Sequence, residues 1–340
     1  MAFDVTIQPS GQHLEVEDDE TVLEAALRQG FAFPYGCRNG ACGSCKGRVL
    51  SGEVDHGPAK PPGITEAELA DGMALFCQAV PSDDLEIEVR EIGAARDIVV
   101  KTLPCRVARL APLADDIMEL RLQLPANERL QFLAGQYIDI LLKGGERRSY
   151  SLANAPHDDE HLVLHIRHQP GGRFSGMVFG ELQPKSLLRI EGPLGSFFVA
   201  EESPRPRLFV GGGTGFGPLK GMLDHLAHQG LDRPHHLFWG ARDAAGIYAP
   251  EWLQAMHAEH GEHFRFTPVL SGTMAEVVAG FPAVRGFPHQ AVLDACPDLA
   301  AHDVYMAGPP AMIETATAAF LAAGLPEDQL YYDSFAPAVS

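Results

Sequence analysis

The sequence predicts a multidomain protein that combines an α+β module, an antiparallel β-barrel and a doubly wound α/β domain. Three observations lead to this fold class. The chain has 340 residues, which is more than one hydrophobic core usually supports. The apolar pattern changes character twice along the chain, and four of the six cysteines fall in the first quarter. We expect domains at 1–92, 103–202 and 203–340, with a linker at 93–102.

The first module is predicted from two alternating segments and one helix signal. Residues 3–7 and 85–89 alternate apolar with polar side chains, as half-buried strands do. Between them, Thr21 and Glu24 form the capping-box pattern that opens a short helix, which we expect to end at Gln29. The remainder of this region is rich in loop residues, so a small α+β module is expected.

The other two domains are predicted from the change in pattern after the linker. Strand-like segments at 117–124, 137–142 and 162–167 are separated by turn residues, a spacing typical of an antiparallel barrel. From about residue 205, short apolar runs such as 208–210 and 304–306 alternate with helix-length stretches. That alternation predicts a doubly wound α/β sheet.

The charge of the chain restricts its partners. The formal net charge is −19, so nucleic acids and anionic membranes would repel the protein. The charge serves either solubility or docking to a basic surface on a protein partner. No apolar run approaches the roughly 20 residues of a membrane span. The start of the chain lacks the features of a signal peptide, so we expect a cytoplasmic protein.

The cysteine spacing predicts an iron–sulfur cluster. Four cysteines follow the plant-type [2Fe–2S] spacing, C-x4-C-x2-C followed by one distant residue: Cys37, Cys42, Cys45 and Cys77. Glycines within this loop would let backbone N–H groups approach the cluster sulfides. The alternatives are a zinc site or reduced buried thiols, but zinc sites usually contain paired C-x2-C units and only one is present. Cys105 and Cys296 are expected to be ordinary buried thiols.

Two glycine-rich segments predict phosphate binding. Residues 211–218, GGGTGFGP, follow a predicted strand and precede a helix, where the backbone can approach a pyrophosphate at the helix N-terminus. Residues 171–175, GGRFS, also open a helix and present N–H groups in the same way. A nicotinamide site beside a one-electron cluster requires a flavin, which converts hydride into single electrons.

Several stretches resemble the ferredoxin–NADP reductase superfamily, and within it bacterial NADH-dependent reductases built from ferredoxin, flavin and nicotinamide domains. They are RSYSLAN at 148–154, LHIRHQPGG at 164–172, EGPLGSFF at 191–198, FWGAR at 238–242 and YYDSF at 331–335. The resemblance implies that Arg148 pairs with the flavin phosphate, that Tyr150 packs on the isoalloxazine and that Ser151 hydrogen-bonds near N5. It also implies that Phe335 shields the flavin face.

The same resemblance assigns the remaining cofactor residues. Those expected around the flavin are Ser149, Asn154, His165, Ile166, Arg167, Gly171, Gly172, Phe174 and Ser175. Those expected around the nicotinamide cofactor are Gly213, Thr214, Gly215, Pro218, Gly240, Arg242, Ala307, Gly308 and Pro309. Ala307 stands where the family has a cysteine, which removes any role for a thiol there. The catalytic residues expected are Ser151, Tyr150 and Phe335.

The expected activity is electron transfer from NADH through FAD and the [2Fe–2S] cluster to a protein acceptor. FAD is favoured over FMN by the resemblance, and NADH over NADPH because Arg242 is the only cation in residues 239–246 and Asp243 lies beside it. The acceptor is expected to be an iron–sulfur dehydrase or an oxygenase component. A redox-sensing iron–sulfur protein and a free-flavin reductase remain as alternatives.

Overall fold

The computed structural model describes residues 2–90 and 98–336, so part of the predicted linker at 93–102 lies outside the described residues. The chain forms two compact units. Of the described residues, the first unit comprises 2–90, 98–99, 195–197 and 336, and the second comprises 100–194 and 198–335. Within the described residues, no helix has the length and apolar character needed to cross a membrane.

The first unit is a β-grasp-like ferredoxin fold. Its five-stranded sheet has the order β2-β1-β7-β3-β5, in which β1 pairs parallel with β7 and the other pairs are antiparallel. The elements are β1 (Phe3–Gln8), β2 (Gln12–Val16), α1 (Val22–Arg28), β3 (Lys46–Ser51), β4 (Val54–Asp55), α2 (Glu66–Ala70), β5 (Met73–Leu75), β6 (Val80–Pro81) and β7 (Leu85–Glu88). The alternation predicted at 3–7 and 85–89 is therefore confirmed as two neighbouring strands.

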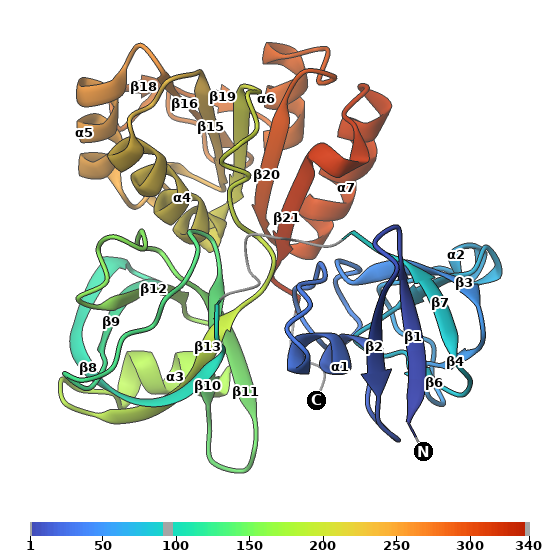
Figure 1. Cartoon of the computed structure of the whole chain (residues 1–340). Coiled ribbons are helices and arrows are strands. Elements are labelled where there is room, and N and C mark those ends of the chain that lie inside the picture. Colours follow the sequence, from blue (N-terminus) through green and yellow to red (C-terminus); the bar gives the residue numbers. More distant parts are fainter. Residues whose placement is uncertain (1, 91–97, 337–340) are drawn as a thin grey trace. The chain divides into compact units, whose positions relative to one another are not determined.

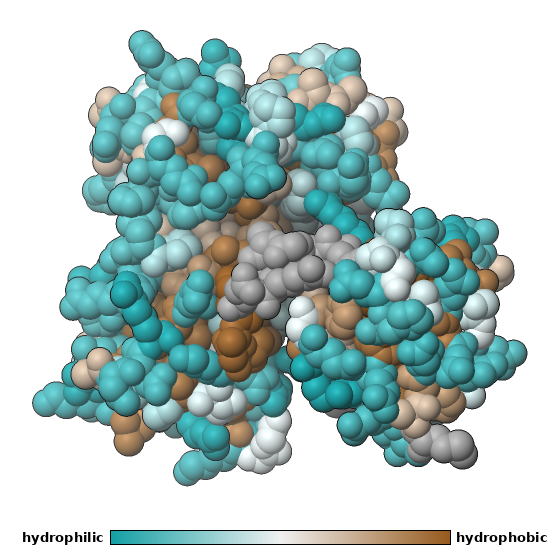
Figure 2. Space-filling model, viewed as in Figure 1, coloured by the Kyte–Doolittle hydropathy of each residue, from teal (hydrophilic) through white to brown (hydrophobic). Residues whose placement is uncertain are grey.

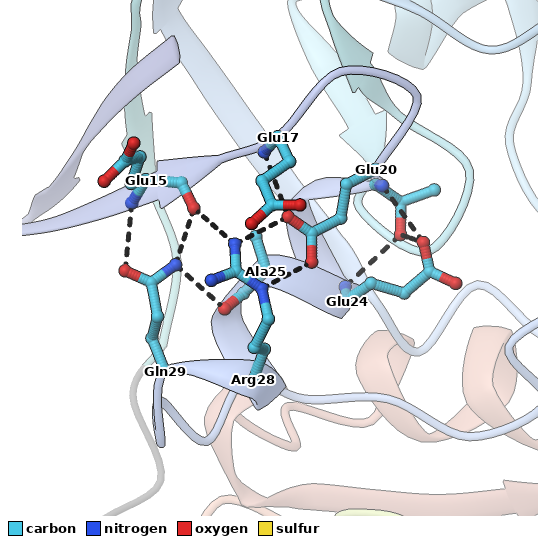
Figure 3. A network of polar contacts seen from close by, with 8 residues as sticks. Glu15, Glu17, Glu20, Glu24, Ala25, Arg28 and Gln29 are labelled. Atoms are coloured by element: carbon cyan, nitrogen blue, oxygen red, sulfur yellow. Dashed lines mark hydrogen bonds and ion pairs between the residues drawn. The ribbon is translucent and has the colours of Figure 1, made fainter. Parts of the chain in front are cut away.

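Helix α1 is fixed at its start by the predicted capping box and at its end by a polar network (Figure 3). The Thr21 side chain accepts a hydrogen bond from the Glu24 N–H, and the Glu24 side chain accepts from the Thr21 N–H. Arg28 in the last turn binds the Glu20 carboxylate at 2.7 and 2.8 Å and donates to the Glu15 carbonyl at 2.9 Å. These contacts tie the helix to β2 and to the segment that follows it.

The first half of the second unit is an antiparallel barrel. Its strand order is β11-β10-β13-β8-β9-β12, and a bridge between Leu152 and Leu164 joins the two edge strands. This bridge closes the sheet, so the predicted barrel is confirmed. The elements are β8 (Lys101–Ala114), β9 (Ile117–Gln123), β10 (Tyr137–Leu141), β11 (Arg147–Ser151), β12 (Leu162–Arg167), α3 (Arg173–Gly180) and β13 (Leu187–Leu194).

The second half of this unit is a doubly wound α/β domain, as predicted. Its parallel sheet has the order β19-β16-β15-β14-β20-β21. Helices α4 and α5 lie on one side of the sheet, and α6 and α7 lie on the other (Figure 1). The principal elements are β14 (Arg207–Gly212), α4 (Phe216–Gln229), β15 (His235–Ala241), α5 (Pro250–His260), β16 (Phe264–Leu270), β19 (Val284–Arg285), α6 (Pro288–Ala295), β20 (Asp303–Gly308), α7 (Pro310–Ala322) and β21 (Leu330–Ser334).

Short elements complete that domain. They are the 3-10 turns η2 (Gly213–Gly215), η3 (Ala244–Gly246) and η4 (Glu327–Gln329) and the two-stranded ribbon of β17 (Val277–Val278) and β18 (Phe281–Pro282). Strand β14 lies between β15 and β20, so the chain winds away from it in both directions. The carboxyl ends of β14 and β20 therefore form the topological switch point, where such sheets bind ligands.

The hydrophilic surface and the burial of Cys105 agree with the sequence predictions, and the burial of Cys296 does not. On the face shown in Figure 2, hydrophilic residues cover most of both units, as the charge of −19 leads one to expect. Cys105 is buried in the barrel core, as predicted. Cys296 is only partly buried, so the prediction of a buried thiol is wrong there: it follows the last residue of α6, where a helix end leaves the core.

Candidate functional site

The four predicted cluster cysteines lie together in the first unit. Three come from the loop between α1 and β3, and Cys77 follows β5. The Cys37 N–H points at the Cys42 sulfur at 3.4 Å, and the Cys42 N–H points at the Cys37 sulfur at 3.3 Å. Both sulfurs thus already receive backbone N–H groups, which is the environment that stabilises a negatively charged iron–sulfur cluster.

Glycines allow the loop to pack this closely around the thiols. A Cβ on Gly36 would lie 3.3 Å from the Cys42 sulfur, and Gly40 and Gly43 have φ angles of +78° and +77°. A Cβ on Gly63 would come within 2.7 Å of the Gly40 carbonyl. Side chains at these positions would displace the backbone from the sulfurs. The loop therefore fits a cluster that must be approached by N–H groups.

The four thiols form two side-chain pairs, Cys37 with Cys42 and Cys45 with Cys77, and in each pair one thiol has a lowered pKa and its partner, Cys42 or Cys45, a raised pKa. The Cys42 side chain and the N–H groups of Asn39, Cys42 and Ala41 lower the pKa of Cys37 to about 6. In the second pair, the Cys45 side chain is the main cause of the lowered pKa of Cys77. Thiolates are the ligand form of cysteine, and a plant-type cluster takes two for each iron.

The barrel presents the predicted flavin motif along β11. Tyr150 is partly buried and packs on Phe174, with ring centroids 5.4 Å apart, and burial raises its pKa to about 12. The Ser151 hydroxyl donates a 2.7 Å hydrogen bond to the Asp333 carboxylate on β21. The barrel motif and the end of the α/β sheet therefore meet at Ser151.

The charged residue of that motif forms an ion-pair chain. Arg148 binds the Glu146 carboxylate at 2.8 Å, and Arg173 forms an ion pair with the other oxygen of the same carboxylate. Arg173 is the first residue of α3, whose N-cap is Gly172 and whose first turn contains no acidic residue. Two guanidinium groups and an uncapped helix N-terminus thus converge at one place, which suits a phosphate group.

Other residues predicted to bind flavin have side chains engaged within the barrel. The Ser149 hydroxyl donates to the Asp139 carboxylate at 2.6 Å, and the Asn154 amide binds the backbone of the loop before β12. The Ser175 hydroxyl binds backbone groups of Gln169 and Gly172. Ile166 is fully buried in the barrel core. These residues shape the backbone, and their contact with a cofactor stays a prediction.

The predicted nicotinamide loop lies at the switch point of the α/β sheet. Gly213 has a φ of +55°, and a Cβ there would lie 3.3 Å from the Arg167 guanidinium. A Cβ on Gly215 would lie 1.9 Å from the Ala307 carbonyl oxygen. Only glycine permits this contact between the β14 loop and the end of β20. Thr214, Pro218, Gly308 and Pro309 lie in the same two segments.

An aromatic cluster fixes the barrel against the nucleotide loop. His165 on β12 hydrogen-bonds the Tyr248 hydroxyl at 3.1 Å, and burial lowers the pKa of His165 to about 3. Phe216 at the start of α4 stacks on Trp239 with centroids 3.8 Å apart, and the Trp239 indole donates to the Gly213 carbonyl at 2.9 Å. His165 is therefore neutral near pH 7 and positions the two halves relative to each other.

The predicted adenosine end lies beyond β15. A Cβ on Gly240 would meet Pro288 at 2.5 Å, and the Arg242 side chain is exposed. The Asp243 carboxylate caps η3 by accepting a 3.3 Å hydrogen bond from the Gly246 N–H. Asp243 thus has a structural contact as well as a charge next to Arg242.

Sequence reasoning gave no role to three residues that the structure brings into these sites: Glu146, Arg173 and Asp333. The last two lie inside the stretches GGRFS and YYDSF, but only their neighbours were assigned. Glu146 lies two residues before Arg148, immediately before the start of β11. No spacing rule links residue 151 to residue 333, so only the fold could reveal that pair.

The comparisons with known proteins define the class of protein. Three family models match in the order of the domains: a 2Fe-2S iron-sulfur cluster binding domain at 5–82, an oxidoreductase FAD-binding domain at 104–199 and an oxidoreductase NAD-binding domain at 209–318. The chain is therefore an iron–sulfur flavoprotein oxidoreductase that moves electrons from a reduced nicotinamide cofactor through FAD to a [2Fe–2S] cluster.

Relatives along the full length identify the family more closely. The chain is 38% identical over 99% of both chains to the CDP-6-deoxy-L-threo-D-glycero-4-hexulose-3-dehydrase reductase of Yersinia pestis. It is 34% identical, over 98% of this chain and 95% of the other, to the phenol hydroxylase P5 protein of Acinetobacter pittii. The crystal structure of the Amycolatopsis cytochrome P450 reductase GcoB matches with a TM-score of 0.81 and 35% identity, over 99% of this chain and all of the other. The chain belongs to the ferredoxin reductase-type family of such reductases.

Proposed function

We propose that this chain supplies electrons to a CDP-6-deoxy-hexulose 3-dehydrase, and so resembles CDP-6-deoxy-Δ3,4-glucoseen reductase in its reaction. The observation that carries the proposal is the 38% identity to the Yersinia reductase over 99% of both chains. A second Yersinia reductase of the same name matches over the same share of the chain. The acceptor is then an iron–sulfur dehydrase that receives electrons one at a time.

A second candidate acceptor is an oxygenase component. It is favoured by the phenol hydroxylase and propane 2-monooxygenase reductases, which are 34% and 33% identical over nearly the whole chain. The lower identity makes this the weaker candidate. The two acceptors require the same electron path within this chain, so they differ only in the partner.

The electron path assigns a task to each group of residues. Cys37, Cys42, Cys45 and Cys77 hold the cluster as two pairs of thiolates. When bound, FAD converts the hydride of a reduced nicotinamide into single electrons. The backbone of the β14 loop and of the β20 end, free of bulky side chains, receives the nicotinamide nucleotide.

With FAD bound, Arg148 would hold its phosphate and Tyr150 would pack against its ring. The Ser151 hydroxyl donates its hydrogen to Asp333, so its oxygen would be left to accept a hydrogen bond from bound FAD. Phe335 follows directly after β21, and its N–H donates to the Gly308 carbonyl at 2.9 Å. This hydrogen bond holds the aromatic residue beside the segment that receives the nicotinamide, which supports its role as a shield of the flavin face.

We also propose a cytoplasmic location. All six cysteines are free thiols, the state that a reducing compartment maintains and that cluster assembly requires. The nicotinamide cofactor is consistent with this location.

The acceptor is tested by reconstitution. The purified chain is combined with NADH and either the iron–sulfur dehydrase with its CDP-sugar substrate or a phenol hydroxylase oxygenase component. We expect coupled NADH oxidation and product formation with the dehydrase and only background oxidation with the oxygenase. Efficient coupling to the oxygenase alone would overturn the proposal.

The flavin site is tested separately with Arg148→Ala. We expect this variant to lose FAD during extensive dialysis, because a guanidinium is the strongest side-chain partner of a phosphate. The FAD content of the dialysed protein, measured by absorbance after denaturation, decides the result. Full occupancy would show that Arg148 has only a structural role.

A further inference from the structure

The β10–β11 turn places a carboxylate between two guanidinium groups. Glu146 immediately precedes β11, and its N-terminal neighbours form the turn after β10. One Glu146 oxygen binds Arg148 on β11, and the other binds Arg173 at the start of α3. Each guanidinium therefore has the same anion as a partner, although the two arginines come from different elements.

The surroundings of this carboxylate are otherwise suited to an anion from outside the chain. Gly172 caps α3 without a side-chain hydrogen bond, and the first turn of α3 has no acidic residue. Gly171 adopts a φ of +75° with open space around it. Glu146 pairs with both guanidinium groups, while the N-terminus of α3 receives no side-chain cap.

The ion pairs themselves are easily exchanged. The side chains of Glu146, Arg148 and Arg173 are 40%, 31% and 45% exposed. Exposed ion pairs of this kind contribute little to stability, because water competes for both partners. The diphosphate of FAD carries two negative charges, one more than the carboxylate, and its two phosphates can each accept hydrogen bonds from one guanidinium.

We propose that Glu146 is an internal competitor for the diphosphate of FAD, and that Arg173 is the second guanidinium that receives this diphosphate. The inference rests on the proposed role of Arg148 at the flavin phosphate. FAD must displace the Glu146 carboxylate from both arginines, so Glu146 weakens FAD binding and speeds FAD release. FMN has one phosphate, which Arg148 alone can serve, so Arg173 also contributes to the preference for FAD.

The test measures flavin affinity in the full chain rather than activity. The protein is stripped of FAD, and the dissociation constant and the dissociation rate are measured by flavin fluorescence at low ionic strength. We expect Glu146→Gln, which keeps the shape and removes the charge, to bind FAD about two- to fivefold more tightly. We expect Arg173→Gln to bind FAD about tenfold more weakly and FMN within about twofold of the unchanged protein.

Two further variants make the result specific. Glu181→Gln removes one negative charge at the other end of α3 and should change FAD affinity by less than about twofold, since the charge lies far from the N-terminus of α3. The double variant Glu146→Gln/Arg173→Gln should lose much of the gain of Glu146→Gln, because one of the released guanidinium groups is then missing.

Whether Glu146→Gln raises or lowers the affinity for FAD decides whether Glu146 competes with the diphosphate. If Glu146→Gln binds FAD equally or more weakly while its apo form unfolds at the same temperature, Glu146 orients the arginines and does not compete. If Arg173→Gln leaves FAD affinity unchanged, Arg173 is not a diphosphate ligand. Both outcomes are distinct from failure of the proposed flavin site, which would appear as full FAD retention by Arg148→Ala.

Discussion

The first unit keeps three of its four cluster cysteines in one loop, whereas the second unit assembles its candidate cofactor residues from at least six strands and helices. The loop from Cys37 to Cys45 contains no strand or helix, and its thiols are held by backbone N–H groups, by side-chain hydrogen bonds and by close glycine contacts. In the second unit, most candidate residues lie on strands and helices that contribute to a buried core, and the others lie in the loops next to them. The two units therefore depend on their cofactors to different degrees.

The difference has a physical cause. A metal cluster supplies the cross-links that a loop without regular structure lacks, so ligand binding and loop order are coupled in the first unit. The parallel sheet of the second unit has its own core, including Phe209, Val210 and Ala307, each fully buried. That unit can position glycine loops before any nucleotide binds. Loss of a ligand residue should thus be severe in the first unit and graded in the second.

The largest expected effect is that of Cys42→Ser. This change removes one of four thiolates, so we expect iron and acid-labile sulfide to fall from about two each per chain to near zero. Reduction of a one-electron protein acceptor should be lost, while NADH oxidation with ferricyanide, which accepts electrons from the flavin, should remain. The flavin content of the purified variant and both activities are measured together.

Cys296→Ser is the matched control for that experiment. Cys296 is a free, partly buried thiol of the second unit, so its variant should retain cluster and both activities. Loss of the ferricyanide activity in Cys42→Ser, in protein that still holds FAD, would contradict the independence of the two units.

The second expected effect is a loss of stability of the second unit in acid. Burial lowers the pKa of His165 to about 3 and the pKa values of His235 and His236 to about 4. The unfolded chain binds these protons near pH 6.5, so it holds more protons than the folded chain between about pH 6.5 and 4. Stability is therefore full above pH 6.5 and falls as the pH drops toward 4, by on the order of a few kcal/mol.

The two tryptophans of the chain can report the loss of stability of the second unit separately from the first unit. Trp239 and Trp252 both lie in the second unit, so tryptophan fluorescence follows its thermal unfolding. We expect the midpoint to fall steadily between pH 7 and 4.5, and His236→Gln to reduce the slope. His13→Gln, in an exposed position of the first unit, should leave the slope unchanged. A midpoint that does not vary over this range would show that these histidines are not held neutral by burial.

The third effect concerns Ser151. Removing its hydroxyl with Ser151→Ala should slow flavin reduction by NADH about tenfold, as loss of one oriented hydrogen bond does. Asp333→Asn keeps a hydrogen-bond acceptor beside the hydroxyl, so its effect should be smaller. Stopped-flow bleaching of the flavin absorbance at equal FAD occupancy gives both rates. Unchanged rates in Ser151→Ala would restrict Ser151 to packing.

The sequence predicted the cluster site of the first unit more completely than the cofactor sites of the second unit, because most cluster ligands lie in one loop. Cysteine spacing is local, so four ligands could be assigned from the chain alone, and the Thr21–Glu24 capping box was equally local. The barrel, the doubly wound sheet and its glycine loop were also foreseeable from periodicity. The contacts of Ser151 with Asp333 and of Arg173 with Glu146 join distant segments, and the half-buried state of Cys296 depends on where a helix ends.

The smallest expected effect is the choice between NADH and NADPH. The Asp243 carboxylate lies next to Arg242 and would repel a 2′-phosphate, but it is held by the Gly246 N–H as the cap of η3. Ala241 at the end of β15 lies opposite Leu270 at the end of β16, and Leu270 lies opposite Arg285 at the end of β19. Arg285 is therefore a second exposed cation at the edge of the sheet where Arg242 lies. These opposing charges should leave a preference for NADH of about tenfold in kcat/KM.

Asp243→Asn keeps the cap and removes the charge, so the preference should fall severalfold, and Arg242→Gln should weaken NADPH alone. The ratio of kcat/KM for the two nucleotides is measured for each variant. Equal values for the unchanged protein, or a preference for NADPH, would mean that the arginines and not Asp243 face the ribose.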